Sequence, residues 1–482
     1  MACKALQPDR SDAIAMNSHG QRYLACWVAM RTAVVLFTRD LRVHDHPALM
    51  AACDAAERVV PLFVFDDAVF AHPIASPNKV AFLLGAVRDL ASTLRDLGGV
   101  LVMRRGQLAE KVTAVTTEVD ASAVFASADV TMFACRRAEA LRQALSKVEL
   151  RLFPGVTACP PGALTTSSGA HYRMFTPYWR AWRAAEHREP LPSPSRIASP
   201  STLRAGPTPK LEELVGGEPS PALPRGGEAA GRALLAQWLD RPVAQYDERR
   251  DGLAADATSR LSSYLHLGCL SPAEVAARVL GVRGAGAEAF LRQLCWRDFH
   301  HQVLAARPEA SWQDWRSQGD DWAVDEARLQ AWKDGRTGYP IVDAGMRQLR
   351  REGWMHNRAR LIVASFLVRD LAVDWRAGAA HFLDLLVDGD IANNQMNWQW
   401  VAGTGTTSRR NRVLSPLRQA ERFDPNGDYA RRYLPELAHI DGPAVHRPWE
   451  LPPDVRAGLD YPDPIVDHAE AVEQFLQARG RR

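Results

Sequence analysis

The first third of the chain alternates between short apolar runs and segments with helical spacing. Residues 33–37 read Ala-Val-Val-Leu-Phe, which is typical of a parallel strand covered on both faces. Apolar residues then recur every three or four positions from Val80 to Leu97, which predicts a helix that the glycines at 98 and 99 end. Further strands are predicted at 59–65, 100–103, 123–126 and 150–153. The pattern indicates a doubly wound α/β domain over residues 31–155.

The pattern changes twice after this domain. Residues 156–230 are rich in Pro, Gly and Ser, which predicts a long interdomain connection. Residues 231–482 show helical spacing and no strand signal of weight, so we expect an all-α domain there. Its clearest helix start is Ser271-Pro272-Ala273-Glu274, with an N-cap serine and a capping-box glutamate. Residues 1–29 lack the apolar segment of a signal peptide, and we expect residues 1–30 to be a disordered extension, or else the start codon to be assigned too early.

The overall composition is that of an ordinary globular protein. The chain has 482 residues, 46% of them hydrophobic and 24% charged, with a net charge of +3. Such a small charge does not by itself indicate nucleic acid, so a DNA site would have to be a local basic patch. Seven scattered cysteines without a Cys-x-x-Cys predict neither a disulfide framework nor a metal site, and a cytoplasmic location is expected. No apolar run approaches the roughly 18 residues of a membrane span.

Tryptophan is the one unusual feature of the composition. The chain has 14, and a buried indole needs a hydrogen-bond partner for its N–H, which makes it a costly way to fill a core. Stacking or redox roles would explain the rings that core packing does not. Most lie from position 238 onward, at positions 238, 296, 312, 315, 322, 332, 354, 375, 398, 400 and 449.

One stretch concentrates polar and aromatic side chains. Residues 388–400 read Asp-Gly-Asp-Ile-Ala-Asn-Asn-Gln-Met-Asn-Trp-Gln-Trp. If the stretch is mostly helical, Asp390, Asn394 and Trp398 lie on one face and could contact a flat, polar partner. A redox ring system suits that face better than a metal, because Ala392 and Asn393 stand where a calcium loop needs an oxygen ligand and a glycine. The alternative is an ordinary amphipathic helix after a turn.

This stretch resembles the flavin-binding segment of the photolyase/cryptochrome family. Further segments resemble the family in chain order, so that the resemblance extends from Thr32 to His468, and its motifs are most similar to class I cyclobutane pyrimidine dimer DNA photolyases. It implies an α/β N-terminal domain, an all-α domain that binds FAD, and light-driven electron transfer. The further matching segments are residues 38–49, 175–179, 258–262, 293–300, 337–349 and 353–360.

The resemblance also implies a set of FAD contacts. Asn394 resembles the amide beside flavin N5, and a neutral amide there favours the fully reduced, anionic flavin that repair needs. Trp398, Trp375 and Trp322 match the family's electron relay in identity and spacing, although they could instead be core rings. The FAD-binding residues that it implies are Tyr246, Thr258, Ser259, Arg260, Leu261, Ser262, Asn357, Arg360, Asp388, Gly389, Asp390 and Asn394.

A second set of implied residues faces damaged DNA. Trp296 and Trp400 resemble the aromatic walls of a pocket for a flipped-out lesion. The basic run 409–412 is expected either to contact the DNA backbone or to be a solvated loop. The implied DNA- and lesion-binding residues are Arg250, Gln293, Trp296, Arg297, His300, Asn357, Arg358, Trp400 and Gln419.

The function expected from these features is light-dependent splitting of cyclobutane pyrimidine dimers in UV-damaged DNA. A cryptochrome-like blue-light photoreceptor is the alternative. Gln293 and Leu361 favour it, because they depart from the Glu and Met of many dimer photolyases, whereas Asn394 opposes it. The histidine pair of (6-4) photolyases is also missing, because Asn357 and Leu361 stand at its two positions. A third hypothesis, binding without photochemistry, predicts a broken tryptophan relay, and the relay is complete.

Two expectations concern the N-terminal domain and the assembly. The resemblance implies a possible antenna chromophore, either 8-hydroxy-5-deazaflavin or methenyltetrahydrofolate, and the alternative is a purely structural α/β domain. No Gly-x-Gly-x-x-Gly follows the first predicted strand, so a dinucleotide site is not expected there. We expect a monomer.

Overall fold

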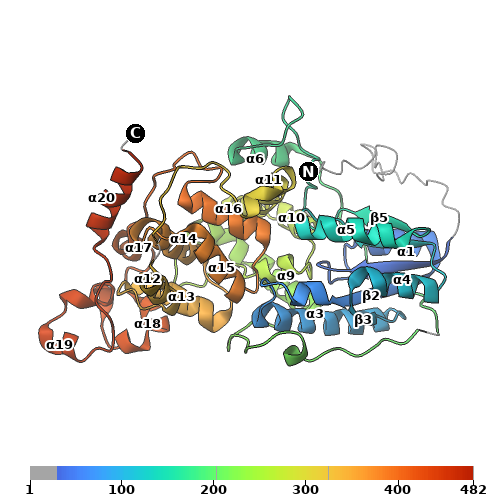
Figure 1. Cartoon of the computed structure of the whole chain (residues 1–482), viewed down its shortest axis with the longest axis horizontal. Coiled ribbons are helices and arrows are strands. Elements are labelled where there is room, and N and C mark those ends of the chain that lie inside the picture. The colour runs from blue at the N-terminus through green and yellow to red at the C-terminus, as the bar shows by residue number, and fades with distance from the viewer. Residues whose placement is uncertain (1–29, 202, 324, 481–482) are drawn as a thin grey trace.

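The computed structural model describes residues 30–201, 203–323 and 325–480. The extension predicted at residues 1–30 lies outside them, apart from Met30. An α/β unit and a helical unit lie side by side, at the right and the left of Figure 1. The predicted fold class is confirmed.

The sheet has five parallel strands in the order β3-β2-β1-β4-β5. The central strand β1 pairs with β2 on one side and β4 on the other, with Leu36 opposite Leu62 and Ala126. The carboxyl ends of β1 and β4 therefore meet where the strand order reverses, which is where open α/β sheets bind ligands. The strand bounds are β1 Met30–Phe37, β2 Ala56–Asp66, β3 Val102–Gly106, β4 Ala123–Ser127 and β5 Glu149–Phe153.

Each face of the sheet is covered by helices, as the uninterrupted apolar strands predict. Val35 and Phe37 of β1 belong to a core with α1 (Pro47–Ala55) and α3 (Pro77–Asp96), whereas Val34 and Leu36 pack with α4 (Leu108–Glu118) and α5 (Met132–Leu145). The short helix α2 spans Asp67–Phe70. Helix α3 ends just before Gly98, whose φ of +84° favours glycine, as predicted.

The connection between the two units is held against the helical unit. Its helix α6 (Phe175–Ala184) packs on α11 (Ala285–Ala306). The buried Asp298 of α11 accepts hydrogen bonds from the backbone N of Cys159 at 2.8 Å and from Nε1 of Trp182 at 3.0 Å. A carboxylate that is paired in this way fixes the path of the connection.

The second unit is helical, and its only β contact among the described residues is an isolated bridge between Ala323 and Val373. Oγ of Ser271 accepts the backbone N–H of Glu274 at 3.3 Å, so the predicted N-cap is confirmed. A π-helical turn, η4, covers Phe366–Asp370. The remaining α-helices are α7 Glu228–Asp240, α8 Tyr246–Arg249, α9 Ser262–His266, α10 Pro272–Leu280, α12 Glu326–Asp334, α13 Pro340–Glu352, α14 Asn357–Ser365, α15 Trp375–Leu385, α16 Ile391–Ala402, α17 Pro416–Phe423, α18 Asp428–Tyr433, α19 Pro453–Ala457 and α20 His468–Ala478.

Helix α16 lies at the junction of two hydrophobic cores. Met396 belongs to the core that runs from the sheet through α6 and α11, whereas Trp398 belongs to the core of α12 to α18. The stretch that the sequence singles out therefore contributes side chains to both cores, with seven of its first eleven residues buried and Asn397 exposed.

Candidate active site

Helices α14 and α16 form the walls of a cavity that encloses, with its open mouth, about 520 Å³. Six residues that the sequence assigns to flavin contact or electron transfer lie together in its lining: Asn357, Arg360, Asp388, Gly389, Asn394 and Trp398. The rest of the lining is Leu361, Ala364, Phe382, Leu386, Asn393, Asn397 and Val401.

An ion pair forms one edge of this cavity. Nη2 of Arg360 lies 2.8 Å from Oδ2 of Asp388, and Nε of Arg360 donates to the carbonyl of Met355 at 2.8 Å. The other carboxylate oxygen, Oδ1 of Asp388, is buried and has no hydrogen-bond partner within the described residues. Buried acceptors are normally paired. This oxygen therefore fits an N–H donor of a bound polar ring.

The amide of Asn394 is buried and held in place. Its Nδ2 donates to the carbonyl of Ala379 at 3.1 Å and to Oε1 of Gln395 at 3.0 Å. An amide carries no ionisable proton, so the cavity presents a neutral group at this point.

Asp390 has a different place from the one predicted. It precedes α16 as the N-cap, and its Oδ1 accepts the backbone N–H of Asn393 at 2.9 Å. Its Oδ2 lies 2.6 Å from Nη2 of Arg39, whose Nη1 lies 3.0 Å from Asp129. Burial alone would raise the pKa of Asp390, but His301 and Arg39 hold it well below its usual value. A short carboxylate at a helix start bonds the first turn, so Asp390 is absent from the cavity lining that contains Asn394 and Trp398.

The predicted phosphate segment, residues 258–262, runs into the start of α9 and contacts Trp354 in the turn between α13 and α14. Oγ1 of Thr258 is buried and has no partner in the described part of the chain, and Oγ of Ser262 accepts Nε1 of Trp354 at 3.2 Å. Arg260, however, already pairs with Asp256 at 2.7 Å and with Glu352 at 2.8 Å. Its charge is balanced, and the backbone N–H of Leu261 already donates to Oγ of Ser259 at 3.4 Å, so the hydroxyl groups of Thr258, Ser259 and Ser262 are the donors left for an anion.

Tyr246 belongs to an aromatic cluster beside this segment. Its ring lies 5.5 Å from those of Trp238 and Phe290, and burial raises the pKa of its hydroxyl to about 12. The hydroxyl is therefore a neutral hydrogen-bonding group at neutral pH.

The three predicted relay tryptophans share one core but differ in burial. Trp398 and Trp375 are buried, and Trp322 is half-buried beside the bridge that joins Ala323 to Val373. Gly378, one turn after Trp375, lies against Trp398, because a Cβ there would be 2.2 Å from Cη2 of that ring. The rings thus extend from the cavity through the core toward the surface.

Sequence reasoning missed one neighbour of this relay. The buried Trp332 has its ring centroid 6.1 Å from that of Trp398. Trp332 was only one of many tryptophans in the sequence, and no local spacing distinguished it.

The predicted lesion walls lie at less buried positions. Trp296 is half-buried, and Phe175 of α6 stacks on its ring with centroids 3.6 Å apart and planes 5° from parallel. Trp400 lines a small cavity together with Arg409 and Arg412 of the basic run. Four other predicted DNA contacts are also half-buried: Arg250, Gln293, Arg358 and Gln419.

Two predicted DNA contacts also bond to groups of the protein itself. Nη1 of Arg297 donates to the carbonyl of Val156 at 2.5 Å, and Nη2 donates to that of Leu265 at 3.3 Å. Nδ1 of His300 lies 3.1 Å from Oδ1 of Asn393, and burial lowers the pKa of His300 to about 4. His300 is buried and Arg297 is half-buried, and their contacts hold neighbouring segments against α11.

No helix among the described residues is long and apolar enough to cross a membrane. No group of three or more His, Cys, Asp or Glu residues in that part of the chain could hold a metal ion.

Comparison with known proteins extends these observations. Residues 290–481 match the model of the FAD binding domain of DNA photolyase, and residues 33–195 match the DNA photolyase model. A deoxyribodipyrimidine photo-lyase of Streptomyces griseus is 53% identical over 94% of this chain and 100% of its own length. A cryptochrome DASH of Gloeobacter violaceus is 35% identical over 91% of this chain and 94% of its own. A bacterial class III photolyase from Agrobacterium tumefaciens has a crystal structure with a TM-score of 0.87 and 35% identity, covering 95% of this chain and 98% of that one. The chain therefore belongs to the DNA photolyase family.

Proposed function

We propose that this protein is a deoxyribodipyrimidine photo-lyase, which splits cyclobutane pyrimidine dimers in UV-damaged DNA under light. One observation carries the proposal. A single cavity brings together the Arg360–Asp388 pair, the neutral Asn394 amide and Trp398, and Trp400 of the same helix lines a second cavity with Arg409 and Arg412. The 53% identity to a deoxyribodipyrimidine photo-lyase supports the same activity.

FAD fits the first cavity. Bound and reduced, FAD supplies one electron to the dimer after absorbing light and recovers it when the cyclobutane ring has opened. Asp388 offers an acceptor for a ring N–H, and Asn394 keeps an acidic proton away from the ring. Thr258, Ser259 and Ser262 offer hydroxyl groups to the pyrophosphate. Trp398, Trp375 and Trp322 conduct electrons from the surface to the cavity, which keeps the cofactor reduced.

The DNA side would hold a flipped-out dimer between Trp296 and Trp400. Flat indoles replace the stacking that an extruded base loses. Gln293 would donate to or accept from the lesion without adding negative charge. Arg250, Arg358, Gln419 and the basic run 409–412 would contact phosphates, so binding should weaken with salt.

We further propose an antenna chromophore on the α/β unit, of the deazaflavin or folate class. Helix α5 begins at the carboxyl end of β4, beside the point where the strand order reverses. There Phe133 is 40% exposed, and the guanidinium of Arg137 lies 5.6 Å above its ring. An exposed aromatic ring with a cation above it suits a planar, negatively charged chromophore. The scattered cysteines, with no Cys-x-x-Cys among them, support a reducing compartment such as the cytoplasm, and a monomer is proposed.

The test is light-dependent repair by the purified protein. Its flavin is reduced, and the protein is mixed with UV-irradiated oligo(dT). Recovery of thymine absorbance under blue light, but not in the dark, would establish dimer repair. If flavin is bound and photoreducible but absorbance does not recover, the cryptochrome-like photoreceptor becomes the better assignment, and Gln293→Glu is the variant to test next.

A further inference from the structure

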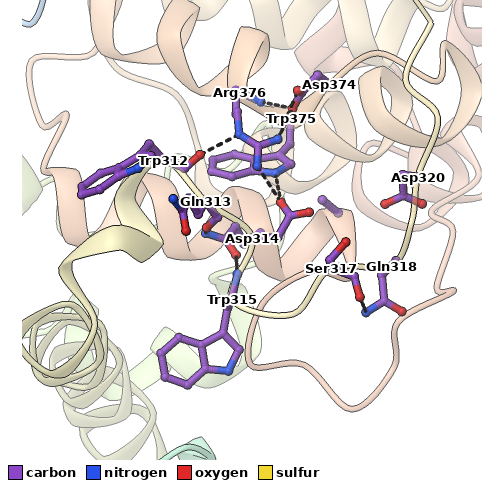
Figure 2. Close-up of polar contacts among 12 residues, drawn as sticks. Trp312, Gln313, Asp314, Trp315, Ser317, Gln318, Asp320, Asp374, Trp375 and Arg376 are labelled. Carbon is purple, nitrogen blue, oxygen red and sulfur yellow. Dashed lines mark hydrogen bonds and ion pairs between the residues drawn. The ribbon is translucent and has the colours of Figure 1, made fainter.

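The two buried relay tryptophans differ in what their indole N–H meets. Nε1 of Trp375 donates to Oδ1 of Asp314 at 2.9 Å, as Figure 2 shows. Nε1 of Trp398 is buried without a hydrogen-bond partner among the described residues. The rings are 0% and 2% exposed, so burial does not distinguish them. What distinguishes the two rings is the carboxylate of Asp314, which accepts the indole N–H of Trp375.

The charges around Trp375 leave a net negative balance. The guanidinium of Arg376 lies 4.7 Å from the centre of the Trp375 ring, and it pairs with Asp314 at 2.9 Å and with Asp374 at 3.1 Å. One cation thus lies between two carboxylates, as Figure 2 shows. Of the two, Asp314 is the one that accepts the indole N–H.

The relay helix itself fixes the segment that carries Asp314. Oε1 of Gln399 accepts the backbone N–H of Trp315 at 2.7 Å, and Nε2 of Gln399 donates to the carbonyl of Ala310 at 2.7 Å. Nε2 of Gln395 donates to the carbonyl of Ser311 at 2.7 Å. Helix α16, which bears Trp398, therefore also holds the backbone on both sides of Asp314.

We propose that Asp314 is a positioning residue of the electron relay, which makes Trp375 easier to oxidise than Trp398. The proposal rests on the proposed function of the tryptophans. A charged acceptor strengthens its hydrogen bond when the donor becomes positive, and a poorly solvated site enlarges the effect. Positive charge that reaches Trp398 therefore moves on to Trp375 and does not return to the cavity.

The step is a one-electron transfer that balances within the chain. A bound, photoexcited and oxidised flavin would be the electron acceptor: Trp398 would give up one electron and take one from Trp375. Trp375 becomes a radical cation, and its Nε1 proton stays in the hydrogen bond to Asp314. Trp322 then supplies an electron to Trp375, and an external thiol reductant restores Trp322.

Two matched variants isolate the contact. Asp314→Asn keeps the size of the side chain and an oxygen for the indole N–H but removes the charge. Asp374→Asn removes a charge from the same Arg376, keeps a side chain able to cap α15, and has no contact with the indole N–H. The flavin-loaded, oxidised proteins are compared by transient absorption of the tryptophan radical, and by the rate of flavin photoreduction with a thiol present.

We expect Asp314→Asn to lower the yield of long-lived tryptophan radical by about tenfold, because a neutral acceptor forms a weaker hydrogen bond than a charged one. Asp374→Asn should lower the yield by less than about twofold. Asp314→Glu, which restores a carboxylate, should recover most of the yield. An unchanged yield in Asp314→Asn, or an equal loss in both asparagine variants, would overturn the proposal.

Chemically reduced enzyme separates this inference from the proposed function. Dimer repair by prereduced protein does not use the relay, so wild type, Asp314→Asn and Asp374→Asn should repair equally. A loss of that repair confined to Asp314→Asn would also overturn the inference, because Asp314 would then act outside the relay. If wild type itself repairs no dimers, the proposed function fails, and the radical yields still decide the role of Asp314.

Discussion

The flavin side of the site, around Asp388 and α16, and the DNA side, around the basic run 409–412, differ in how their charges are paired. On the flavin side, Arg360 pairs with Asp388, and Arg39 pairs with Asp390, with both carboxylates buried. On the DNA side, Arg412 is exposed, and its pKa is lowered by partial burial and then by Arg409, Arg358 and Arg422. The first side is electrostatically complete and suits a resident cofactor. The second has an excess of cations, which suits a polyanion that binds and leaves.

The completed side also depends on the α/β unit. Arg39 follows β1 and Asp129 follows β4, so both lie where the strand order of the sheet reverses. Together they hold Asp390 at the start of α16. The sheet edge that binds ligands in other α/β proteins is used here, in part, to position the helix that lines the flavin cavity.

The largest expected effect comes from breaking this buried network. Arg39→Ala leaves Asp129 and Asp390 buried without their cation, which should cost about 3–5 kcal/mol of unfolding free energy and reduce FAD content. Urea unfolding and the flavin-to-protein absorbance ratio measure the two effects.

A surface arginine is the control for that variant. Arg105 lies 3.5 Å from Asp67 and 3.8 Å from Glu213, and all three side chains are about half exposed. Arg105→Ala should change the unfolding free energy by about 0.5 kcal/mol or less. Equal small losses in both variants would show that the buried network does not stabilise the site.

The next largest effect tests the open side. Trp296→Ala removes a stacking surface for the flipped lesion, which should weaken binding of damaged DNA by about 1–3 kcal/mol, or roughly 5- to 150-fold. FAD content should stay unchanged. Fluorescence anisotropy with a dimer-containing oligonucleotide measures the affinity. Trp312→Ala is the control, because Trp312 is 45% exposed and has no predicted DNA contact. Equal affinities of Trp296→Ala and wild type would remove Trp296 from the lesion pocket.

The sequence predicted those features that depend on local spacing and on family motifs. The strands, the Ser271 cap and the cavity lining from Asp388 to Trp398 depend on residues that are close in the chain. It did not predict the pairs that complete the site, because Arg39 and Asp390 are 351 positions apart, and Asp314 and Trp375 are 61 apart.

The same limit applies to two arginines among the predicted site residues, Arg260 and Arg297. A sequence motif does not distinguish an arginine that binds phosphate from one that is already paired. The carboxylate of Glu352, which balances Arg260, is 92 positions away. Arg297 likewise bonds carbonyls from two distant segments, at Val156 and Leu265.

A smaller effect concerns α14, whose Arg360 lines the flavin cavity and whose Arg358 pairs with Asp251. Nδ1 of His356 caps this helix by accepting the backbone N–H of Arg358 at 3.1 Å. Burial lowers the pKa of His356 from 6.5 to about 4. The folded state therefore needs the neutral ring. Its contribution to stability is complete above pH 6.5 and is lost as the pH falls toward 4.

His356→Asn keeps a capping oxygen that does not titrate. Between about pH 7.5 and about pH 5.5, wild type should lose about 1 kcal/mol more unfolding free energy than the variant does. Urea unfolding at the two pH values measures the difference. His72→Asn is the control, because Nδ1 of His72 also accepts a backbone N–H, that of Ile74, but the His72 side chain is exposed. Parallel pH profiles for His356→Asn and wild type would contradict the prediction.

The smallest expected effect decides between the two interpretations of the basic run. If Arg412 neutralises a DNA phosphate, Arg412→Ala should reduce the slope of log affinity against log salt by about 1, for damaged and undamaged DNA alike. Arg241→Ala is the control, because its side chain is 90% exposed, lies 3.7 Å from Asp240 and has no predicted DNA contact. The measurement is a salt titration of oligonucleotide binding. An unchanged slope for Arg412→Ala would make this run a solvated loop, and the excess charge on the open side would then have to act through Arg358 and Arg422.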